Sequence, residues 1–412
     1  GRMIAQSIPI LLTPILTRIY SPEDFGVFGV FATIVAIVGM VSNGRYCLSI
    51  ILPKSIEKSK RLFFLSSALT ILTVLLFAIF LLIWGKGFFS VLNVSILYDY
   101  RIVVILAVLF IGLYEDAYYF ALRVKAFKIL TSNIIVQALL LIVSRLVFGY
   151  LGFTDSGLII SYLLGYSISF FLMIFRVEIP IKSLIKEFQI KQYISLMKEY
   201  YRFPKYSLLA DTLSMTSNMS PSILLNKVFG VAQAGFYSMS DKILGSPLWL
   251  VTSAVGDVFR QEASEQLREK GSCYDIFRKT VKAMFLLGIG PFLLIFITAP
   301  YFIPFLLGPG WEEVGVFIRI FAIMYFVRFI VRPVYTVLYI VKKQNYNAIF
   351  QGINLFSIIT AFVIGALTRN LYLTLVLWSV FSSLSYLIIL VFSYKFAKES
   401  HYEPEHENIE MV

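Results

Sequence analysis

Long apolar stretches, separated by short polar segments, recur along the whole chain. A helix needs about 20 mainly apolar residues to cross the roughly 30 Å hydrocarbon core of a bilayer. We therefore expect transmembrane helices at Met3–Leu16, Phe25–Leu48, Leu62–Trp84, Ile102–Leu122, Ile129–Leu151, Gly157–Phe175, Pro204–Leu225, Ala234–Val258, Val281–Ala299, Val314–Val341, Tyr346–Leu367 and Leu371–Phe396. The pattern predicts an all-α integral membrane protein with about 12 transmembrane helices.

Composition supports this class. Of the 412 residues, 58% are hydrophobic and 15% are charged, and the mean hydropathy is +0.81. A soluble domain has roughly 45–50% apolar and 25% charged residues. So much apolar surface needs lipid to cover it. The first span is short and the chain begins at Gly1 without an initiator Met, so we expect further residues before it.

The positions of the basic residues give the orientation. If the N-terminus is inside, most of the 36 Lys and Arg residues fall in inner loops. The outer loops hold only Arg18, Lys86, Arg101, Lys227 and Arg369. An excess of Lys and Arg marks cytoplasmic loops. The sequence therefore predicts that both termini are cytoplasmic, and the net charge of +12 is not a nucleic-acid-binding surface.

The longest inner loop divides the twelve spans into two sets of six. We expect bundles at 1–177 and 204–396, joined by a cytoplasmic linker at 178–203 and followed by a polar, disordered tail at 397–412. The linker has apolar residues at helical spacing with lysines between them, which is typical of an interfacial helix on anionic lipid headgroups. Six spans are an even number, so the two halves would form a parallel repeat.

A weak internal repeat agrees with this division. Pro14 precedes Gly26-Val27-Phe28 in the first half, and Pro221 precedes Gly235-Phe236-Tyr237 in the second half. Each pair joins the first and second spans of its half. Transporters with such repeats bind substrate between the halves near the middle of the membrane.

Several motifs resemble one family. Residues Thr17 to Gly26 (TRIYSPEDFG) resemble the R-x-Y-x-P-E-x-F/Y-G signature of Wzx-type polysaccharide flippases, in the multidrug/oligosaccharidyl-lipid/polysaccharide (MOP) exporter superfamily. Further similar segments follow in order: Arg45-Tyr46 with Ile50 to Pro53, Arg202 to Tyr206, Gly235 to Tyr237 with Pro247, and Gly308 to Trp311 with Gly315. Where the family has an acid after Arg-Tyr, this chain has Cys47, so no role is transferred to that position.

The resemblance implies two six-helix bundles around a central cavity. It also implies the substrate, an undecaprenyl-pyrophosphate-linked oligosaccharide repeat unit that is flipped across the bacterial inner membrane for O-antigen, capsule or exopolysaccharide assembly. Such a flippase would meet membrane lipids and could work beside a polysaccharide polymerase and chain-length proteins. It would be a transporter and not an enzyme.

Basic residues inside the spans are candidates for binding the substrate. A charge at the bilayer centre costs about 2.5–3.5 kcal/mol on insertion scales, so each needs a partner or a function. The set contains Arg145, Lys242, Arg319, Arg328 and Arg332. Arg328 and Arg332 are four residues apart and share a helix face, and the arginine fork suits pyrophosphate oxygens. The structural alternative is that each pairs with a carboxylate such as Asp211.

Acidic residues inside the spans are candidates for ion coupling. Glu115, Asp116 and Asp211 are each about seven residues, or roughly 10 Å, from an inner helix end, and Asp241 lies in the eighth span. A carboxyl group removed from water holds a proton more readily, so one of them could carry a proton during the return step. Arg45 and Asp257 lie close enough to the inner boundary to snorkel and are set aside.

No other chemistry is expected. Cys47 and Cys273 are far apart and predicted to be free thiols, and both histidines fall in the tail, so neither a metal site nor a cofactor is predicted. A cation-coupled drug antiporter of the same superfamily remains an alternative, which would favour buried acids. A membrane glycan polymerase, ligase or glycosyltransferase usually needs a large outer loop, which the predicted topology lacks. A non-transporting glycan-assembly scaffold also remains open.

Overall fold

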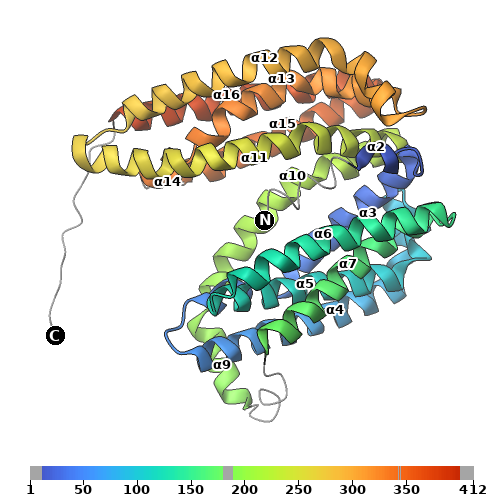
Figure 1. Ribbon diagram of the computed structural model, residues 1–412, viewed down its shortest axis with the longest axis vertical. Helices are drawn as coiled ribbons and strands as arrows, with labels where there is room; N and C mark the ends of the chain where they lie inside the picture. Colours follow the sequence, from blue (N-terminus) through green and yellow to red (C-terminus); the bar gives the residue numbers. More distant parts are fainter. Residues whose placement is uncertain (1–11, 180–188, 342, 344, 400–412) are drawn as a thin grey trace. The chain divides into compact units, whose positions relative to one another are not determined.

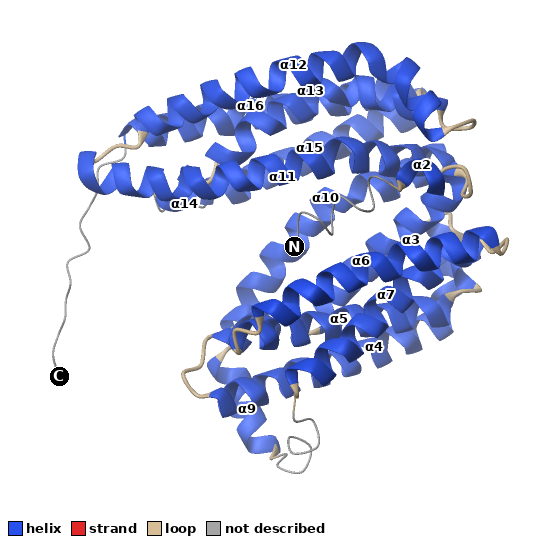
Figure 2. Cartoon of the chain, in the orientation of Figure 1, coloured by secondary structure: helices blue, strands red, loops and turns tan. Residues whose placement is uncertain are grey.

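The computed structural model describes residues 12–179, 189–341, 343 and 345–399, and within these ranges the chain is helical with no strand (Figures 1 and 2). The principal helices are α2 (Thr13–Leu16), α3 (Pro22–Ser42), α4 (Ile56–Val91), α5 (Arg101–Arg123), α6 (Phe127–Tyr150), α7 (Thr154–Val177), α9 (Ile190–Glu199), α10 (Leu208–Phe229), α11 (Val231–Lys270), α12 (Tyr274–Leu307), α13 (Glu312–Val334), α14 (Val337–Ile340), α15 (Asn345–Thr368) and α16 (Leu371–Glu399). The predicted all-α fold is confirmed.

The chain forms two compact units. Unit 1 comprises Gly1–Met239 and Ile303–Val314, and unit 2 comprises Ser240–Phe302 and Gly315–Val412. Unit 1 therefore includes α10, which the sequence assigns to the second bundle. The predicted segments 1–177 and 204–396 remain a proposal about which helices move together. Of the predicted interfacial linker, the described part contains α9, and the predicted tail lies almost wholly outside the described residues.

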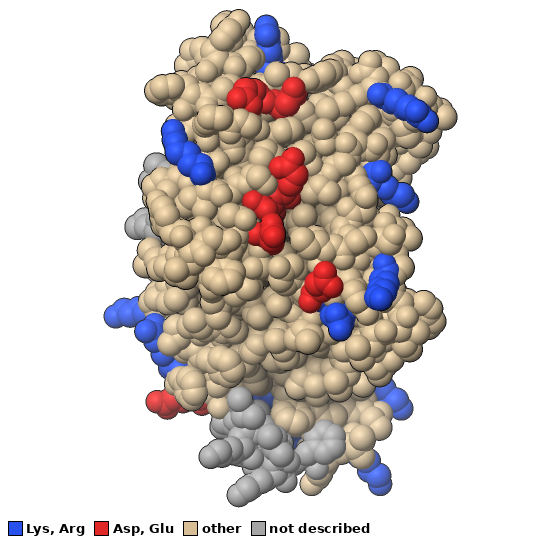
Figure 3. Space-filling model, turned by 90° about the vertical axis from the view of Figure 1, so that its right-hand side faces the viewer, with Lys and Arg blue, Asp and Glu red and all other residues tan. Residues whose placement is uncertain are grey.

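The helices carry the apolar surface that lipid contact requires. Nine helices in the described ranges are long and apolar enough to cross a membrane. Side chains such as Leu72, Leu76 and Leu82 on α4 are exposed, and most of the surface seen in Figure 3 is uncharged. Of the other three predicted spans, the first falls largely outside the described residues. The other two correspond to α10 and α11, which are helical but more polar.

A hydrogen-bonded anchor explains why residues 303–314 belong to unit 1. Trp311 is almost fully buried, and its Nε1 donates to the carbonyl oxygen of Thr17 at 2.9 Å. The Thr17 hydroxyl donates in turn to the carbonyl oxygen of Leu307 at 2.7 Å. The Trp311 ring also packs edge-on against Phe25, with ring centroids 5.4 Å apart. The motif residues Thr17, Phe25 and Trp311 thus hold this part of the fold together.

The two repeat motifs pack directly against each other in unit 1. A side chain on Gly26 would overlap the backbone carbonyl of Val231, and a side chain on Gly235 would overlap the backbone carbonyl of Pro22. The contact is reciprocal, because the start of α3 meets the start of α11 and each contributes one glycine. Only glycine lets two helix backbones approach so closely.

Unit 2 has its own apolar core between α11, α12, α13 and α16. Phe259, Phe277, Val334 and Leu338 are buried in it. The backbone N–H of Cys273 donates to the carbonyl oxygen of Ala397 at 3.2 Å, which ties the start of α12 to α16.

Candidate functional site

A left-handed turn after α3 sets the position of Arg45. The helix ends at Ser42, and Gly44 and Arg45 both have positive φ, at 57° and 61°. This conformation is unfavourable for a residue other than glycine, so surrounding contacts must hold it. One such contact is the hydrogen bond that the Arg45 N–H donates to the Asn43 side-chain oxygen at 2.9 Å.

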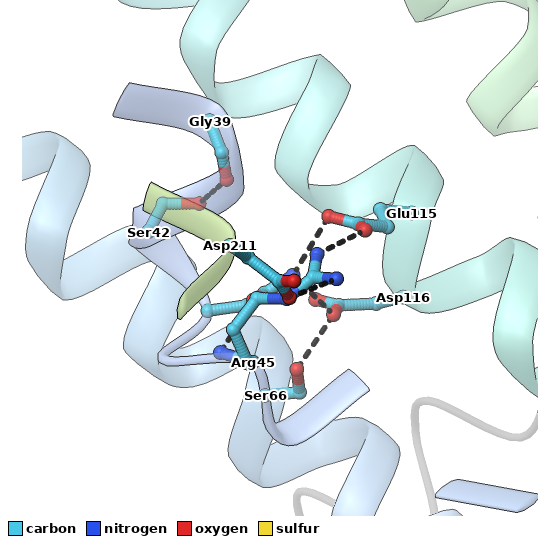
Figure 4. Close-up of polar contacts among 8 residues, drawn as sticks. Gly39, Ser42, Arg45, Ser66, Glu115, Asp116 and Asp211 are labelled. Carbon is cyan, nitrogen blue, oxygen red and sulfur yellow. Dashed lines mark hydrogen bonds and ion pairs between the residues drawn. The ribbon is translucent and has the colours of Figure 1, made fainter. Parts of the chain in front are cut away.

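The Arg45 guanidinium lies between two carboxylates from different helices (Figure 4). Its Nη1 is 2.9 Å from Glu115 Oε1 on α5, and its Nη2 is 2.7 Å from Asp211 Oδ2 on α10. The exposed side-chain fractions are 13% for Arg45, 27% for Glu115 and 39% for Asp211. The snorkelling interpretation of Arg45 was wrong, because the turn directs its side chain into the unit and not toward the headgroups.

Asp116 occupies a different environment from its neighbour Glu115. It is fully buried, and its carboxylate accepts hydrogen bonds from Ser66 at 2.6 Å, Ser67 at 3.2 Å and Thr70 at 3.4 Å, all on α4. Asn43 donates to both Asp116 and Glu115, at 3.3 Å in each case. The three acids predicted near one depth, Glu115, Asp116 and Asp211, are therefore brought together, with Arg45 and Asn43 between them.

A cavity of about 640 Å³ adjoins this cluster. Its volume is within the roughly 300–1,000 Å³ typical of small-ligand pockets. The lining comes from α3, α5, α6, α7 and α10, and from Arg45 between α3 and α4. It consists of Ala36, Gly39, Met40, Arg45, Ile111, Tyr114, Glu115, Tyr118, Tyr119, Ile134, Gln137, Tyr166, Asp211, Ser214, Met215, Asn218 and Met219. Sequence reasoning identified Glu115 and Asp211 but missed Arg45 and the tyrosines.

Arg145 is not a lining residue, but it interacts electrostatically with the lining residue Tyr166. It is buried, with its guanidinium over the Phe28 ring at 4.8 Å. The Tyr20 hydroxyl donates to the Arg145 carbonyl oxygen at 2.6 Å. Burial raises the pKa of Tyr20 to about 12, although the nearby Arg145 charge opposes this shift. This contact fixes the C-terminal end of α6, and a substrate role for Arg145 stays a prediction.

The remaining predicted residues lie in unit 2. The Tyr325 hydroxyl donates to the Asp241 carboxylate, and the Arg328 guanidinium lies 5.7 Å from the Tyr325 ring centroid. Arg332 interacts electrostatically with both Arg328 and Asp241. Within unit 2, Asp241 is therefore an acid near these arginines, whereas Asp211, the acid named as an example, binds Arg45 in unit 1. Whether the arginines pair with a carboxylate or bind substrate stays a prediction.

Two further predicted basic residues are also in unit 2. Lys242 is half-buried on α11, next to Asp241. Arg319 is exposed, with its guanidinium 5.3 Å from the Phe296 ring centroid. Whether either contacts a substrate stays a prediction. No group of three or more His, Cys, Asp or Glu side chains suited to a metal ion occurs among the described residues.

These features define a multi-pass helical membrane protein with a polar cavity inside an otherwise apolar body. A family model described as polysaccharide biosynthesis protein matches residues 15–316. The chain belongs to this family, and the expected relationship to polysaccharide biosynthesis proteins is confirmed at this level.

The chain is also similar to one curated relative and to two solved structures. The amylovoran biosynthesis protein AmsL of Erwinia amylovora is 26% identical over 110 residues, an alignment covering 27% of this chain and only 28% of AmsL. An inward-facing MATE-family multidrug resistance transporter of the MOP superfamily is similar with a TM-score of 0.69 and 13% identity, covering 95% of this chain and 93% of the other. The lipid II flippase MurJ, in an inward closed conformation, is similar with a TM-score of 0.73 and 16% identity, covering 95% and 87%. The likenesses to the two solved structures show a shared fold.

Proposed function

We propose that this protein is a flippase that moves an undecaprenyl-pyrophosphate-linked oligosaccharide repeat unit across the bacterial inner membrane. The observation that carries the proposal is a cavity lined by Arg45, Glu115, Asp211 and four tyrosines inside an apolar helical unit. A polar chamber in such a body suits a polar headgroup whose lipid tail stays in the bilayer. Membership of the polysaccharide biosynthesis family supports a glycan substrate.

In this proposal the pyrophosphate binds to the arginines of α13. Arg328 and Arg332 share one helix face, and two guanidinium groups suit the several acceptor oxygens and negative charges of a pyrophosphate. Asp241 is the nearby acid that interacts with Arg332. It would hold the arginine in place between transport cycles and release it to the substrate.

The proposed cycle is alternating access between the segments 1–177 and 204–396. The carboxyl groups Glu115, Asp116 and Asp211 are the proposed carriers of a coupling proton, because they gather beside the cavity in unit 1. Both termini would be cytoplasmic, and the polysaccharide polymerase and chain-length proteins would act on the flipped product.

Transport of the lipid-linked substrate tests the proposal. The full chain is reconstituted into liposomes with a fluorescent undecaprenyl-pyrophosphate oligosaccharide, and a membrane-impermeant glycosidase reports which leaflet holds the glycan. We expect wild-type protein to expose the inner-leaflet pool, and Arg328→Ala combined with Arg332→Ala to leave it protected. Equal protection with wild-type protein and with empty liposomes would contradict transport and favour a non-transporting assembly role.

One observation favours the second candidate, a cation-coupled drug antiporter. Two carboxylates, Glu115 and Asp211, bind one guanidinium in unit 1, and such an excess of acids suits a cationic compound. The same liposomes loaded with ethidium distinguish the two functions. Ethidium efflux without glycan exposure would select the antiporter.

A further inference from the structure

Tyrosines form one wall of the cavity in unit 1. Tyr114, Tyr118 and Tyr119 come from α5, and Tyr166 comes from α7. Tyr114 and Tyr166 meet edge to face with ring centroids 5.7 Å apart, and Tyr118 and Tyr119 do the same at 5.7 Å. Rings locked in this way offer large, rigid, amphipathic surfaces. The apolar face of a pyranose ring packs on such a surface, and its hydroxyl groups remain free to bind polar partners.

Polar groups line the rest of the same cavity. Glu115 and Asp211 offer carboxylate oxygens, and Asn218 offers an amide. Among the described residues, Arg45 Nε and Gln137 Nε2 are buried lining donors without a hydrogen-bond partner. Buried donors are normally satisfied, so these two suit the hydroxyl or carbonyl oxygens of a ligand. Aromatic faces combined with hydrogen-bonding donors and acceptors are suited to a saccharide.

The charge of the cavity limits which saccharide fits. Arg45 contributes one positive charge, and the lining carboxylates of Glu115 and Asp211 contribute up to two negative charges. Arg145 does not line the cavity: its guanidinium packs over Phe28, behind the lining residue Tyr166 with which it interacts electrostatically. A sugar carboxylate would therefore meet Glu115 and Asp211. Arg45, the one cation among the described lining residues, is already shared between these two carboxylates. Like charges at contact distance in a partly buried site repel strongly.

We infer that the unit 1 cavity is a saccharide subsite that accepts neutral or amino-bearing sugars and rejects acidic ones. The inference rests on the proposed function, because it assigns part of the same substrate. The repeat unit carried by this protein would then present a sugar without a carboxylate to this subsite.

Binding of three disaccharides tests the inference. Purified full-length protein in lipid nanodiscs is titrated with chitobiose, which is neutral, with its de-N-acetylated form, which is cationic, and with a glucuronate-containing disaccharide. We expect saturable binding of the first two. The acidic disaccharide should bind more weakly by on the order of tenfold or more, which corresponds to one unfavourable charge contact.

Variants connect the selectivity to the residues. Glu115→Gln and Asp211→Asn should reduce the discrimination against the acidic disaccharide, whereas Glu57→Gln, the same change in an exposed surface pair, should leave it unchanged. Tyr114→Leu should weaken all three disaccharides, with the exposed Tyr150→Leu as its control. Thermal unfolding in nanodiscs identifies any variant that fails to fold, and the wild-type comparison stands without the variants.

Two outcomes overturn the subsite. One is equal affinity of wild-type protein for the acidic and neutral disaccharides, and the other is the absence of saturable binding for all three. Either result leaves the liposome flipping assay unaffected, so the flippase proposal can stand without this subsite. Selective disaccharide binding together with no flipping of the lipid-linked substrate would support the subsite and contradict the transport proposal.

Discussion

Arg45→Ala is expected to destabilise unit 1 more than any single loss of a surface ion pair. The substitution leaves Glu115 and Asp211 facing each other without the guanidinium that is 2.9 Å from one and 2.7 Å from the other. Breaking a fully buried pair costs about 3–5 kcal/mol, and exposed pairs contribute about 0–1 kcal/mol. With Arg45 13% exposed and its partners 27% and 39% exposed, we expect a loss of about 2 kcal/mol, between these limits.

A double-mutant cycle with Asp211→Asn isolates the pair. Each kcal/mol shifts the unfolding temperature of a unit of this size by about 2–4 °C, so Arg45→Ala should lower it by roughly 4–8 °C. Asp211→Asn alone should cost less, because Arg45 keeps Glu115. The double variant should be more stable than Arg45→Ala alone, because it has one unpaired carboxylate fewer. Thermal unfolding of purified protein in nanodiscs gives the four values.

The control for the cycle is a pair that is equally short but exposed. Lys58 and Glu199 are 2.6 Å apart, with side chains 37% and 47% exposed. Glu199→Gln should leave the unfolding temperature nearly unchanged, because water screens this pair. Strictly additive effects of Arg45→Ala and Asp211→Asn would show that the two side chains do not interact, and the site description would then be wrong.

Four further predictions concern separate parts of the chain. The Cys47 thiol is fully buried, so a maleimide should label it only after denaturation, even at pH 9. Tyr20→Phe removes a 2.6 Å hydrogen bond and should lower the free energy of unfolding by about 0.5–1.5 kcal/mol. The loss should be equal at pH 7 and pH 9, because the pKa of about 12 keeps the hydroxyl protonated at both. A pH-dependent loss measured by thermal unfolding would refute this. At Arg328 and Arg332, surface glycan should fall from Arg to Lys to Ala with protein level unchanged, and normal glycan with both as Ala would refute the binding role. A cysteine replacing the exposed Glu312 should react with an impermeant maleimide from outside, and labelling only after permeabilisation would reverse the predicted topology.

The fold could be predicted from sequence because its cause is the hydrophobic pattern. Apolar runs such as Leu62–Trp84 have the length of a bilayer span, and the structure has a helix there, α4. Two helices, α10 and α11, depart from this hydrophobic pattern. They are less apolar than the other spans, since α10 presents Asp211, Ser214 and Asn218 to the cavity.

The candidate site could be predicted only in part, because depth was counted along straight helices. Such counting placed Glu115 and Asp211 at one level, and they do share a partner. It failed for Arg45, since Gly44 and Arg45 turn the chain through a left-handed conformation that residue counting cannot represent. The tyrosine wall had a usable signal: Tyr114 and Tyr118 are four apart and share a helix face with each other. Tyr166 comes from another helix and needed the structure.

The crossing of Gly26 and Gly235 has a consequence for how this fold can vary. The contact joins backbone atoms of α3 and α11, so its geometry does not depend on which side chains surround it. Mutations that remodel the cavity, for example at Tyr114 or Asn218, can therefore accumulate without displacing the crossing. A scaffold of this kind lets lineages change the residues that line the cavity, and with them the ligand it accepts, by point substitution. The two glycines, by contrast, are positions where almost every substitution is expected to be eliminated.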